Sequence, residues 1–247
     1  MIGKDQPKVS VIIATFNVET SLNKTIDSVL SQSYPNIEII VIDGGSSDGT
    51  VPIVQDYGNS IKYFISEPDK GIADAYNKGI LASSGKWLYF LNSDDVFVNS
   101  NTVYSINLLG KDDLVLVGRV VSDTERVFKG RFNWILLVKN TVHHQAIFYR
   151  SDFLKLFPYN SEYVRYGHDH EHNLMIWKMG IKTRYIKQDV AIWASGGISD
   201  NANWNDYKEE FRVRRNVFGR ISFLFNMFTI LRFVIKKIKK GAKYEVK

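Results

Sequence analysis

The stretch Lys86-Trp87-Leu88-Tyr89-Phe90-Leu91-Asn92-Ser93-Asp94-Asp95 decides the fold. Its first part is an almost continuous apolar run, which is typical of a strand buried on both faces of a sheet. The run ends abruptly in two adjacent carboxylates, so the strand must reach a sheet edge or a cleft at Asp94 and Asp95. Paired acids at the carboxyl end of a parallel strand lie where open α/β sheets bind ligands, and they can hold a hard divalent cation against a phosphate. Taken alone, the segment is equally compatible with a solvated Asp-Asp turn.

Strand and helix patterns alternate on the N-terminal side of this stretch. Strands are expected at residues 9–15, 37–42 and 61–66, and helices at 21–33, 50–57 and 71–83. This alternation predicts βαβ units and hence an α/β fold with a central, mostly parallel sheet flanked by helices. The loops after successive strands then meet at one edge of the sheet, and each of them contains Asp or Asn.

The pattern is looser beyond Asp95. Strands are expected at 114–121, 142–149, 182–186 and 190–193, with a hairpin or loop at 123–134 and a helix at 168–179. No linker rich in Pro or Gly interrupts the chain, so we expect one continuous domain followed by a tail.

The composition bounds the class of protein. The 247 residues are 45% hydrophobic and 23% charged, as in ordinary soluble globular proteins. There is no cysteine, which excludes disulfides and thiolate zinc sites and fits a reducing compartment. No signal peptide is visible, and no uninterrupted apolar run is long enough to span a bilayer.

The net charge of +6 is concentrated in the tail. From Tyr207 onward there are twelve Lys or Arg against three acids, so the rest of the chain is slightly acidic. Residues 221–235 are mostly apolar, and Lys236, Lys237, Lys239 and Lys240 follow them. An apolar helix with a cationic end is typical of an interfacial membrane anchor, and packing on the core or on a dimer partner is the alternative.

The glycine-rich loop Asp43 to Thr50 follows the second strand. It is neither a Walker A motif nor GxGxxG, and no dinucleotide fingerprint occurs elsewhere. Asp43 is placed to accept hydrogen bonds from a base or a ribose. A simple turn with Asp48 or Thr50 capping a helix is the other interpretation.

Four motifs together carry a resemblance. The segments VSVIIATFN, DGGSSDGT, GIADAYNKGI and FLNSDD lie in this order between Val9 and Asp95, and HHQAIFYR and GHDHEHNLMIW extend the match more loosely to about Ser199. The chain resembles family 2 glycosyltransferases, whose fold is called GT-A. Within the family it is similar to bacterial enzymes that build surface polysaccharides, of the O-antigen, capsule or colanic acid type, on a lipid carrier.

The resemblance assigns roles at the nucleotide-sugar site. It implies that Thr15, Phe16 and Glu19 line the base and ribose site and that Asp43 hydrogen-bonds the base. It also implies that Asp74 lies close to the nucleotide. In the acid pair, Asp94 would face the ribose and Asp95 would bind the metal. The expected cofactor is Mg²⁺ or Mn²⁺, which neutralises the charge that builds up on the departing diphosphate.

The same resemblance places the catalytic base just before or within the helix at 168–179. Asp169 aligns with the family's base, His168 replaces the usual Glu, and Glu171 is the second choice. His144, on a predicted strand, is either a structural histidine or a contact to the acceptor or the diphosphate. Histidines at 168, 170 and 172 suggest a metal cluster, but on a helix this spacing scatters them around the axis, which disfavours zinc.

The expected enzyme is an inverting, metal-dependent glycosyltransferase. Residues 1–206 would form the GT-A domain, with a nucleotide-binding half at 8–95 and an acceptor-side half at 96–206, and 207–247 a basic amphipathic tail. A sugar, hexosyl or N-acetylhexosaminyl, would pass from a nucleotide donor, expected to be a UDP-sugar, to a lipid-linked saccharide at the cytoplasmic face of the bacterial membrane. Two alternatives remain: a nucleotidyltransferase, disfavoured by ATFNVET after the first strand, and a non-catalytic membrane or nucleic-acid binder. The acidic rim argues against nucleic acid.

Overall fold

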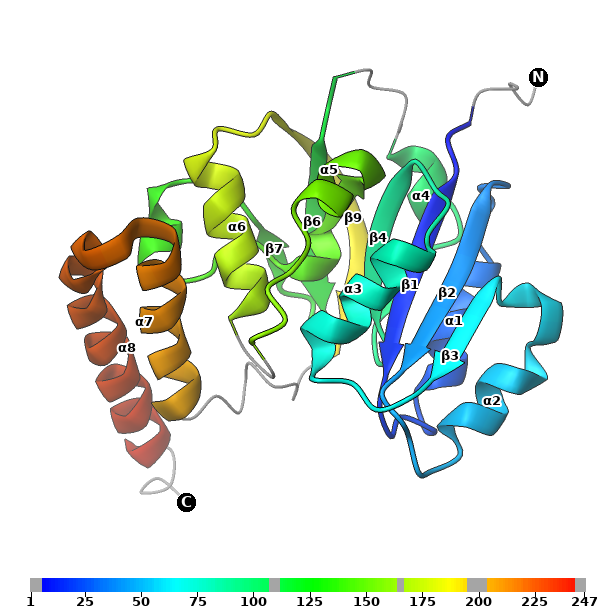
Figure 1. Ribbon diagram of the computed structural model, residues 1–247, viewed down its shortest axis with the longest axis horizontal. Helices are drawn as coiled ribbons and strands as arrows, with labels where there is room; N and C mark the ends of the chain where they lie inside the picture. The colour runs from blue at the N-terminus through cyan, green and yellow to red at the C-terminus, as the bar shows by residue number, and fades with distance from the viewer. Residues whose placement is uncertain (1–5, 107–111, 164–166, 195–203, 243–247) are drawn as a thin grey trace.

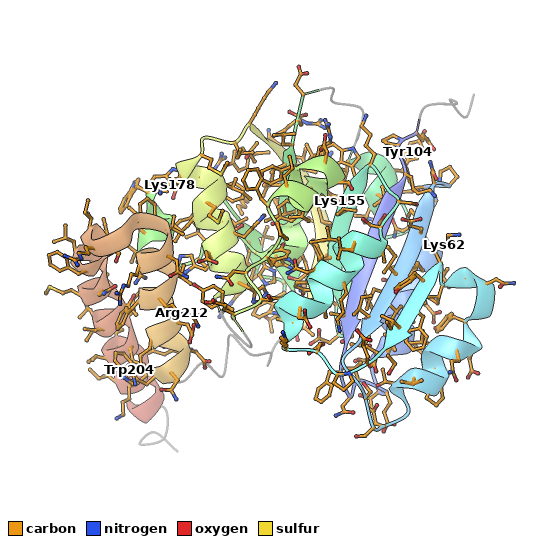
Figure 2. All side chains as sticks on the ribbon, viewed as in Figure 1. Lys62, Tyr104, Lys155, Lys178, Trp204 and Arg212 are labelled. Atoms are coloured by element: carbon orange, nitrogen blue, oxygen red, sulfur yellow. The ribbon has the colours of Figure 1, made fainter. Side chains whose placement is uncertain are left out.

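The computed structural model describes residues 6–106, 112–163, 167–194 and 204–242. A central sheet carries helices on both faces, and a helical hairpin lies at one end of the molecule (Figure 1). Lys62 lies near the opposite end from Trp204 and Arg212, which belong to that hairpin (Figure 2). The predicted α/β class is therefore confirmed.

The first half of the sheet consists of parallel strands in the order β3-β2-β1-β4. Its elements are β1 (Val9–Thr15), α1 (Leu22–Leu30), β2 (Ile37–Asp43), α2 (Thr50–Asp56), β3 (Tyr63–Ser66), α3 (Ile72–Ala82) and β4 (Trp87–Asn92). Nearly every residue of β1, β2 and β4 is buried, as their apolar runs predict. Strand alternation sends Ile12 and Phe90 into the core cluster under α3, and Val11 and Leu91 into the one under α1.

The second half of the sheet is mixed. Its elements are β5 (Val96–Phe97), α4 (Thr102–Ser105), β6 (Val115–Ser122), β7 (Val127–Lys129), β8 (Ile147–Arg150), α5 (Ser151–Leu156), α6 (His168–Lys178) and β9 (Thr183–Trp193). Strand β8 is antiparallel to both β4 and β6, β9 is parallel to β6, and β5 returns antiparallel to β9. Strand β7 forms the predicted hairpin with β6.

Two strand predictions in this half are wrong in detail. The strands expected at 182–186 and 190–193 are one strand, β9, because its pairing with β6 continues through an irregularity at Gly118. A Cβ at Gly118 would lie 2.3 Å from Val190 Cγ2, so glycine allows this close approach. The strand expected from Val142 begins only at Ile147, because residues His144–Ala146 form a 3₁₀ turn.

The tail folds as two antiparallel helices, α7 (Trp204–Phe218) and α8 (Phe223–Ala242), joined by a 3₁₀ turn at Gly219–Ser222. Helix α7 packs on α6, so it is part of the folded body. By length and composition alone, the helical stretch Trp204–Ile238 contains a segment apolar enough to cross a membrane, and little of that segment is buried. It is, however, bent at Gly219, whose φ is +66°.

A buried ionic network fixes this hairpin to the body. Arg214 and Glu210, both almost fully buried, pair at 2.8 Å, and the Thr229 hydroxyl of α8 bonds Glu210. Arg214 and Arg232 both donate to the backbone carbonyl of Val138, at 2.9 and 2.7 Å. Because a buried charge is stable only when it is paired and hydrogen-bonded, these contacts hold α7 and α8 in one position against residue 138.

Candidate active site

Asp43 is the centre of the hydrogen bonds that hold the loops after β1 and β2. Its buried carboxylate accepts hydrogen bonds from the Thr15 hydroxyl (3.0 Å), the Ser66 hydroxyl (2.6 Å) and the Ser46 N–H (2.8 Å). The Ser46 hydroxyl and the Gly45 N–H donate to it as well. Burial alone would raise the pKa of Asp43, but these hydrogen bonds lower it and keep the group ionised. Five donors fill the roughly four acceptor positions of a carboxylate, so Asp43 shapes the loop rather than offering a free oxygen.

Phe16 forms the open part of the rim beside this loop. Its side chain is 61% exposed, and its ring comes within 3.4 Å of the position that a Cβ on Gly44 would take. The Asp69 carboxylate is 2.7 Å from the same position, so a side chain at residue 44 would collide with it. An exposed aromatic ring over a side-chain-free backbone offers a stacking surface to a planar base. Asp69 carries no motif of its own in the sequence, although its loop is predicted to reach this edge.

Glu19 and Asp74 lie on two other parts of the rim. The Glu19 carboxylate accepts a hydrogen bond from the Gly49 N–H at 2.6 Å, at the start of α2. Asp74, in the first turn of α3, accepts one from the Lys70 N–H at 3.1 Å and lies 3.7 Å from Lys78 Nζ. Both carboxylates therefore have partners in or next to their own loops.

Three predicted acids gather around Tyr76, a fully buried residue of α3. Burial raises the pKa of Tyr76 well above its usual range, and the negative charges of Asp169, Asp95 and Asp94 raise it further. The Tyr76 hydroxyl donates to Asn92 Oδ1 at 2.8 Å. Acids that are 74 residues apart in the chain thus lie within electrostatic reach of one hydroxyl.

Asp95 is the most buried of these acids, with no exposed surface. Its carboxylate accepts hydrogen bonds from Gln145 Nε2 and, at 2.9 Å, from the Ala194 N–H that follows β9. Burial, together with the neighbouring charge of Asp94, raises the pKa of Asp95 to about 7. Asp94 itself is exposed, so the pair presents one carboxylate to solvent and one to the interior.

Asp169 stands at the start of α6 and is held from two sides. Its Oδ2 accepts a hydrogen bond from Asn140 Nδ2 at 2.7 Å, and its Oδ1 accepts one from the His170 N–H. Asn140 is in turn bound through its Oδ1 by Asn173 Nδ2 at 3.0 Å. The structure therefore brings Asp169 to the acid group with a fixed side-chain orientation.

Glu171 points elsewhere. Its carboxylate is buried and accepts hydrogen bonds from the Tyr163 hydroxyl (3.1 Å) and from Asn216 Nδ2 of α7 (2.9 Å). Residues two apart on a helix face different directions, so Asp169 and Glu171 do not serve the same site. Glu171 links α6 to α7 instead.

The histidines of α6 have separate partners. His170 Nε2 contacts the Leu136 carbonyl at 2.7 Å and His172 Nε2 contacts the Phe157 carbonyl at 3.1 Å, whereas His168 lies near Tyr76. Burial lowers the pKa of all three. Among the described residues, no three His, Cys, Asp or Glu side chains gather around a metal position. The side chains of residues 168, 170 and 172 therefore lie on different sides of the helix, as their spacing predicts.

His144 lies in the wall of the site. Its ring stacks on Tyr76 with centroids 4.8 Å apart, and its Nε2 lies 2.9 Å from the Tyr159 hydroxyl. Burial first, and then the neighbouring His168, hold the pKa of His144 well below its usual range, so the ring is neutral. The hydroxyl partner and the stacking account for this histidine structurally.

The acid pair suits a hard cation. Mg²⁺ takes one or two carboxylates from a protein and completes its shell with water and substrate phosphates, so Asp94 and Asp95 form a sufficient protein contribution. Burial and the neighbouring charge of Asp94 both disfavour the ionised form of Asp95 and raise its pKa. A divalent cation would offset this negative charge, and the residues present therefore fit Mg²⁺ or Mn²⁺.

The sheet and the acids at its carboxyl edge define a GT-A glycosyltransferase. The chain belongs to Glycosyl transferase family 2, which it matches over residues 10–235. It is 32% identical over 205 residues to a PGL/p-HBAD biosynthesis glycosyltransferase of Mycobacterium bovis, covering 78% of this chain and 80% of that one. It is 31% identical over 203 residues to an uncharacterized glycosyltransferase of Rickettsia typhi, covering 75% of this chain and 63% of that one.

Solved structures share the fold. S. aureus TarS 1–349 in complex with UDP-GlcNAc superposes with a TM-score of 0.66 at 19% identity, over 84% of this chain and 65% of that one. This chain matches only 43% of the longer TarS chain. Mannosyltransferase PcManGT from Pyrobaculum calidifontis, in complex with GDP-Man and Mn²⁺, gives a TM-score of 0.61 at 16% identity, over 99% of this chain and 82% of that one. The family assignment excludes the nucleotidyltransferase alternative and the non-catalytic binder.

The metal role of Asp95 can be tested by substitution. Asp95→Asn is expected to keep the fold and to weaken Mn²⁺ binding in the presence of UDP by about tenfold or more, because a charged contact contributes on the order of 1.5–3 kcal/mol. The measurement is a Mn²⁺ titration followed by electron paramagnetic resonance, and EDTA should abolish turnover of the wild type. Asp56→Asn, an exposed acid at the end of α2, is the matched control. Equal Mn²⁺ affinity in Asp95→Asn and wild type would contradict the assignment.

Proposed function

We propose that this glycosyltransferase moves a sugar, with inversion, from a nucleotide-diphosphate donor to a saccharide on a lipid carrier in cell-surface polysaccharide synthesis. The observation that carries the proposal is the meeting of Asp94, Asp95 and Asp169 around Tyr76. A one-step displacement needs a group that holds the cation and a separate carboxylate that accepts the proton, and this arrangement supports both roles. A UDP-sugar, hexosyl or N-acetylhexosaminyl, is the proposed donor, and the UDP-GlcNAc bound to the structurally similar TarS supports it.

The donor would lie along the carboxyl edge of β1, β2 and β4. The Phe16 ring would stack on the base, and the loop organised by Asp43 would border it. Asp94, as the exposed member of the pair, would face the ribose. The remaining proposed nucleotide contacts are Thr15, Glu19 and Asp74, which hold the loops of this edge.

Asp169 would act as the base. The acceptor oxygen attacks the anomeric carbon, the bond from that carbon to the diphosphate oxygen breaks, and the hydroxyl proton passes to Asp169. Attack from the face opposite the diphosphate turns an α-linked donor into a β-linked product. A Mg²⁺ or Mn²⁺ ion held by Asp95 would neutralise the charge of the departing diphosphate. Tyr76 and neutral His144 would form an uncharged wall, and His144 would contact the acceptor or the diphosphate.

The outer face of α8 supports attachment to a membrane. Its large apolar side chains are each more than 40% exposed: Phe223, Leu224, Met227, Phe228, Ile230, Leu231, Val234, Ile235 and Ile238. Contiguous exposed apolar patches mark binding surfaces, and an apolar helix face next to cationic residues is typical of interfacial helices. Lys236 and Lys237 lie near its end, whereas the side chains of Lys239 and Lys240 lie outside the described residues. We place the enzyme on the cytoplasmic surface of the membrane, close to a lipid-linked acceptor.

The base assignment predicts different effects for the two acids of α6. Asp169→Asn should lower sugar transfer by at least about 100-fold, within the range of a lost general base, while UDP affinity stays near that of the wild type. Glu171→Gln should affect thermal unfolding more than turnover, because Glu171 bonds Tyr163 and Asn216. The assay is acceptor-free hydrolysis over a panel of nucleotide sugars to find the donor, followed by transfer to extracted lipid-linked saccharides. An active Asp169→Asn enzyme alongside an inactive but folded Glu171→Gln enzyme would reverse the assignment.

The membrane surface can be tested without deleting α8, whose Thr229 and Arg232 are needed for the buried network. Met227→Gln with Leu231→Gln should lower binding to anionic vesicles about tenfold or more, because each large apolar side chain contributes roughly 1.5–3 kcal/mol when fully buried. Leu81→Gln with Leu156→Gln, two exposed apolar residues elsewhere, is the control. Co-sedimentation with vesicles measures the effect. If only the α8 variant changes a dimer to a monomer in light scattering and vesicle binding is absent throughout, the face is a subunit interface.

A further inference from the structure

A cavity of about 420 Å³ lies at the bend between α7 and α8. Three arginines line it, Arg212 and Arg215 from α7 and Arg220 from the connecting turn, together with Phe211 and Phe223. None of its lining residues is acidic. The cavity lies outside the candidate active site, since no acid of that site lines it.

The three arginines differ in their partners. Arg212 pairs with Glu162, lies 3.8 Å from Glu209 and stacks on the Tyr163 ring at 5.1 Å. Arg215 and Arg220 are exposed, and neither forms an ion pair with any residue in the described ranges. Two guanidinium groups that line this cavity are therefore available to an anion.

We propose that this cavity binds the phosphate group of an anionic phospholipid, with Arg215 and Arg220 as its ligands. Guanidinium groups match phosphate oxygens in a two-pronged geometry that an ammonium group cannot reproduce. Phe223 lines the cavity and is 66% exposed at the start of the apolar face of α8. A lipid whose phosphate lies at the arginines would therefore have its acyl chains beside that face. The inference rests on the membrane attachment proposed above and names its ligand.

A charge-conserving variant distinguishes a defined phosphate site from general electrostatic attraction to an anionic membrane. Arg215→Lys with Arg220→Lys keeps the charge but loses the forked donors, so preference for phosphatidylcholine vesicles containing phosphatidylglycerol over pure phosphatidylcholine should fall about tenfold. Lys208→Ala with Lys237→Ala, which removes two charges from the same hairpin outside the cavity, should cost less of this preference. Equal preference in the lysine variant and wild type would overturn the site.

Two further outcomes show whether the phosphate site or the membrane attachment is wrong. Wild-type protein that binds both kinds of vesicle equally contradicts the phosphate site alone, whereas protein that binds neither contradicts membrane attachment itself. Inorganic phosphate is added as a competitor. Release of the wild type by inorganic phosphate at concentrations too low to screen charge would overturn the lipid source and indicate a free-phosphate site.

A second inference concerns Asn140 and rests on a separate set of hydrogen bonds. Its side chain donates to the Asp169 carboxylate at 2.7 Å and accepts hydrogen bonds from Asn173 Nδ2 and from the Val142 N–H. Two residues earlier, the Val138 carbonyl is fixed by the arginines of the helical hairpin. Asn140 is thus held on both sides while it holds the carboxylate.

We infer that Asn140 is a positioning residue for Asp169. A hydrogen bond donated to an ionised carboxylate stabilises the form that can accept a proton and fixes its rotamer. The inference rests on the role of Asp169 proposed above. It does not require Asn140 to contact the substrate.

Asn140→Ala should lower kcat about 10- to 100-fold, as expected for a misplaced catalytic group, and leave the KM of the donor nearly unchanged. A fall in kcat at a constant donor KM is a pattern that a merely structural role would not cause. Asn77→Ala, which removes a side chain that bonds the Tyr159 backbone, serves as a control for lost buried hydrogen bonds. A wild-type kcat in Asn140→Ala, or a fall in kcat no larger than in Asn77→Ala, would overturn the inference. Full activity of Asp169→Asn would instead show that the base assignment is wrong.

Discussion

The burial of Asp95 beside Asp94 is the constraint on which the site depends. Like charges in a poorly solvated place repel strongly, and burial alone already penalises an ionised carboxylate. The structure gives Asp95 two neutral donors, the Gln145 amide and the Ala194 N–H. The negative charge at Asp95 would attract a divalent cation, and that cation would in turn bind the diphosphate of the donor. The strand that leads into Asp95 must therefore be rigid, and β4 is buried along nearly its whole length.

Most of the first half of the fold could be predicted from local pattern. Strands buried on both faces have continuous apolar runs, and β1, β2 and β4 lie within a residue of their expected bounds. The second half was harder, because its pairing depends on distant partners. The register between β9 and β6 shifts at residues 186–188 of β9. The sequence there therefore resembles a break between two strands. The 3₁₀ turn that carries His144 likewise has no distinct local pattern.

The candidate site shows the same limit. Motif order placed Asp43, Asp94 and Asp95 at one edge, where the structure has them. Asp169 and Glu171 face different ways on α6, Asp169 toward Asn140 and Glu171 toward Asn216 of α7, and residue spacing alone does not show which residue faces which way. Asn140 belongs to no motif, and Gln145 lies in the loosely matching segment HHQAIFYR without an assigned role. Their contacts join parts of the chain that are 29 and 50 residues apart. Such contacts follow from the tertiary fold and not from spacing.

The buried pairing of Arg214 with Glu210 has a geometric consequence for catalysis at a surface. Through Val138 it fixes the hairpin to the body, and α7 also packs directly on α6. A hairpin lying on a bilayer would therefore hold the catalytic edge at a constant height and tilt above it. The enzyme would then favour acceptors whose growing sugar end lies at that height above the bilayer.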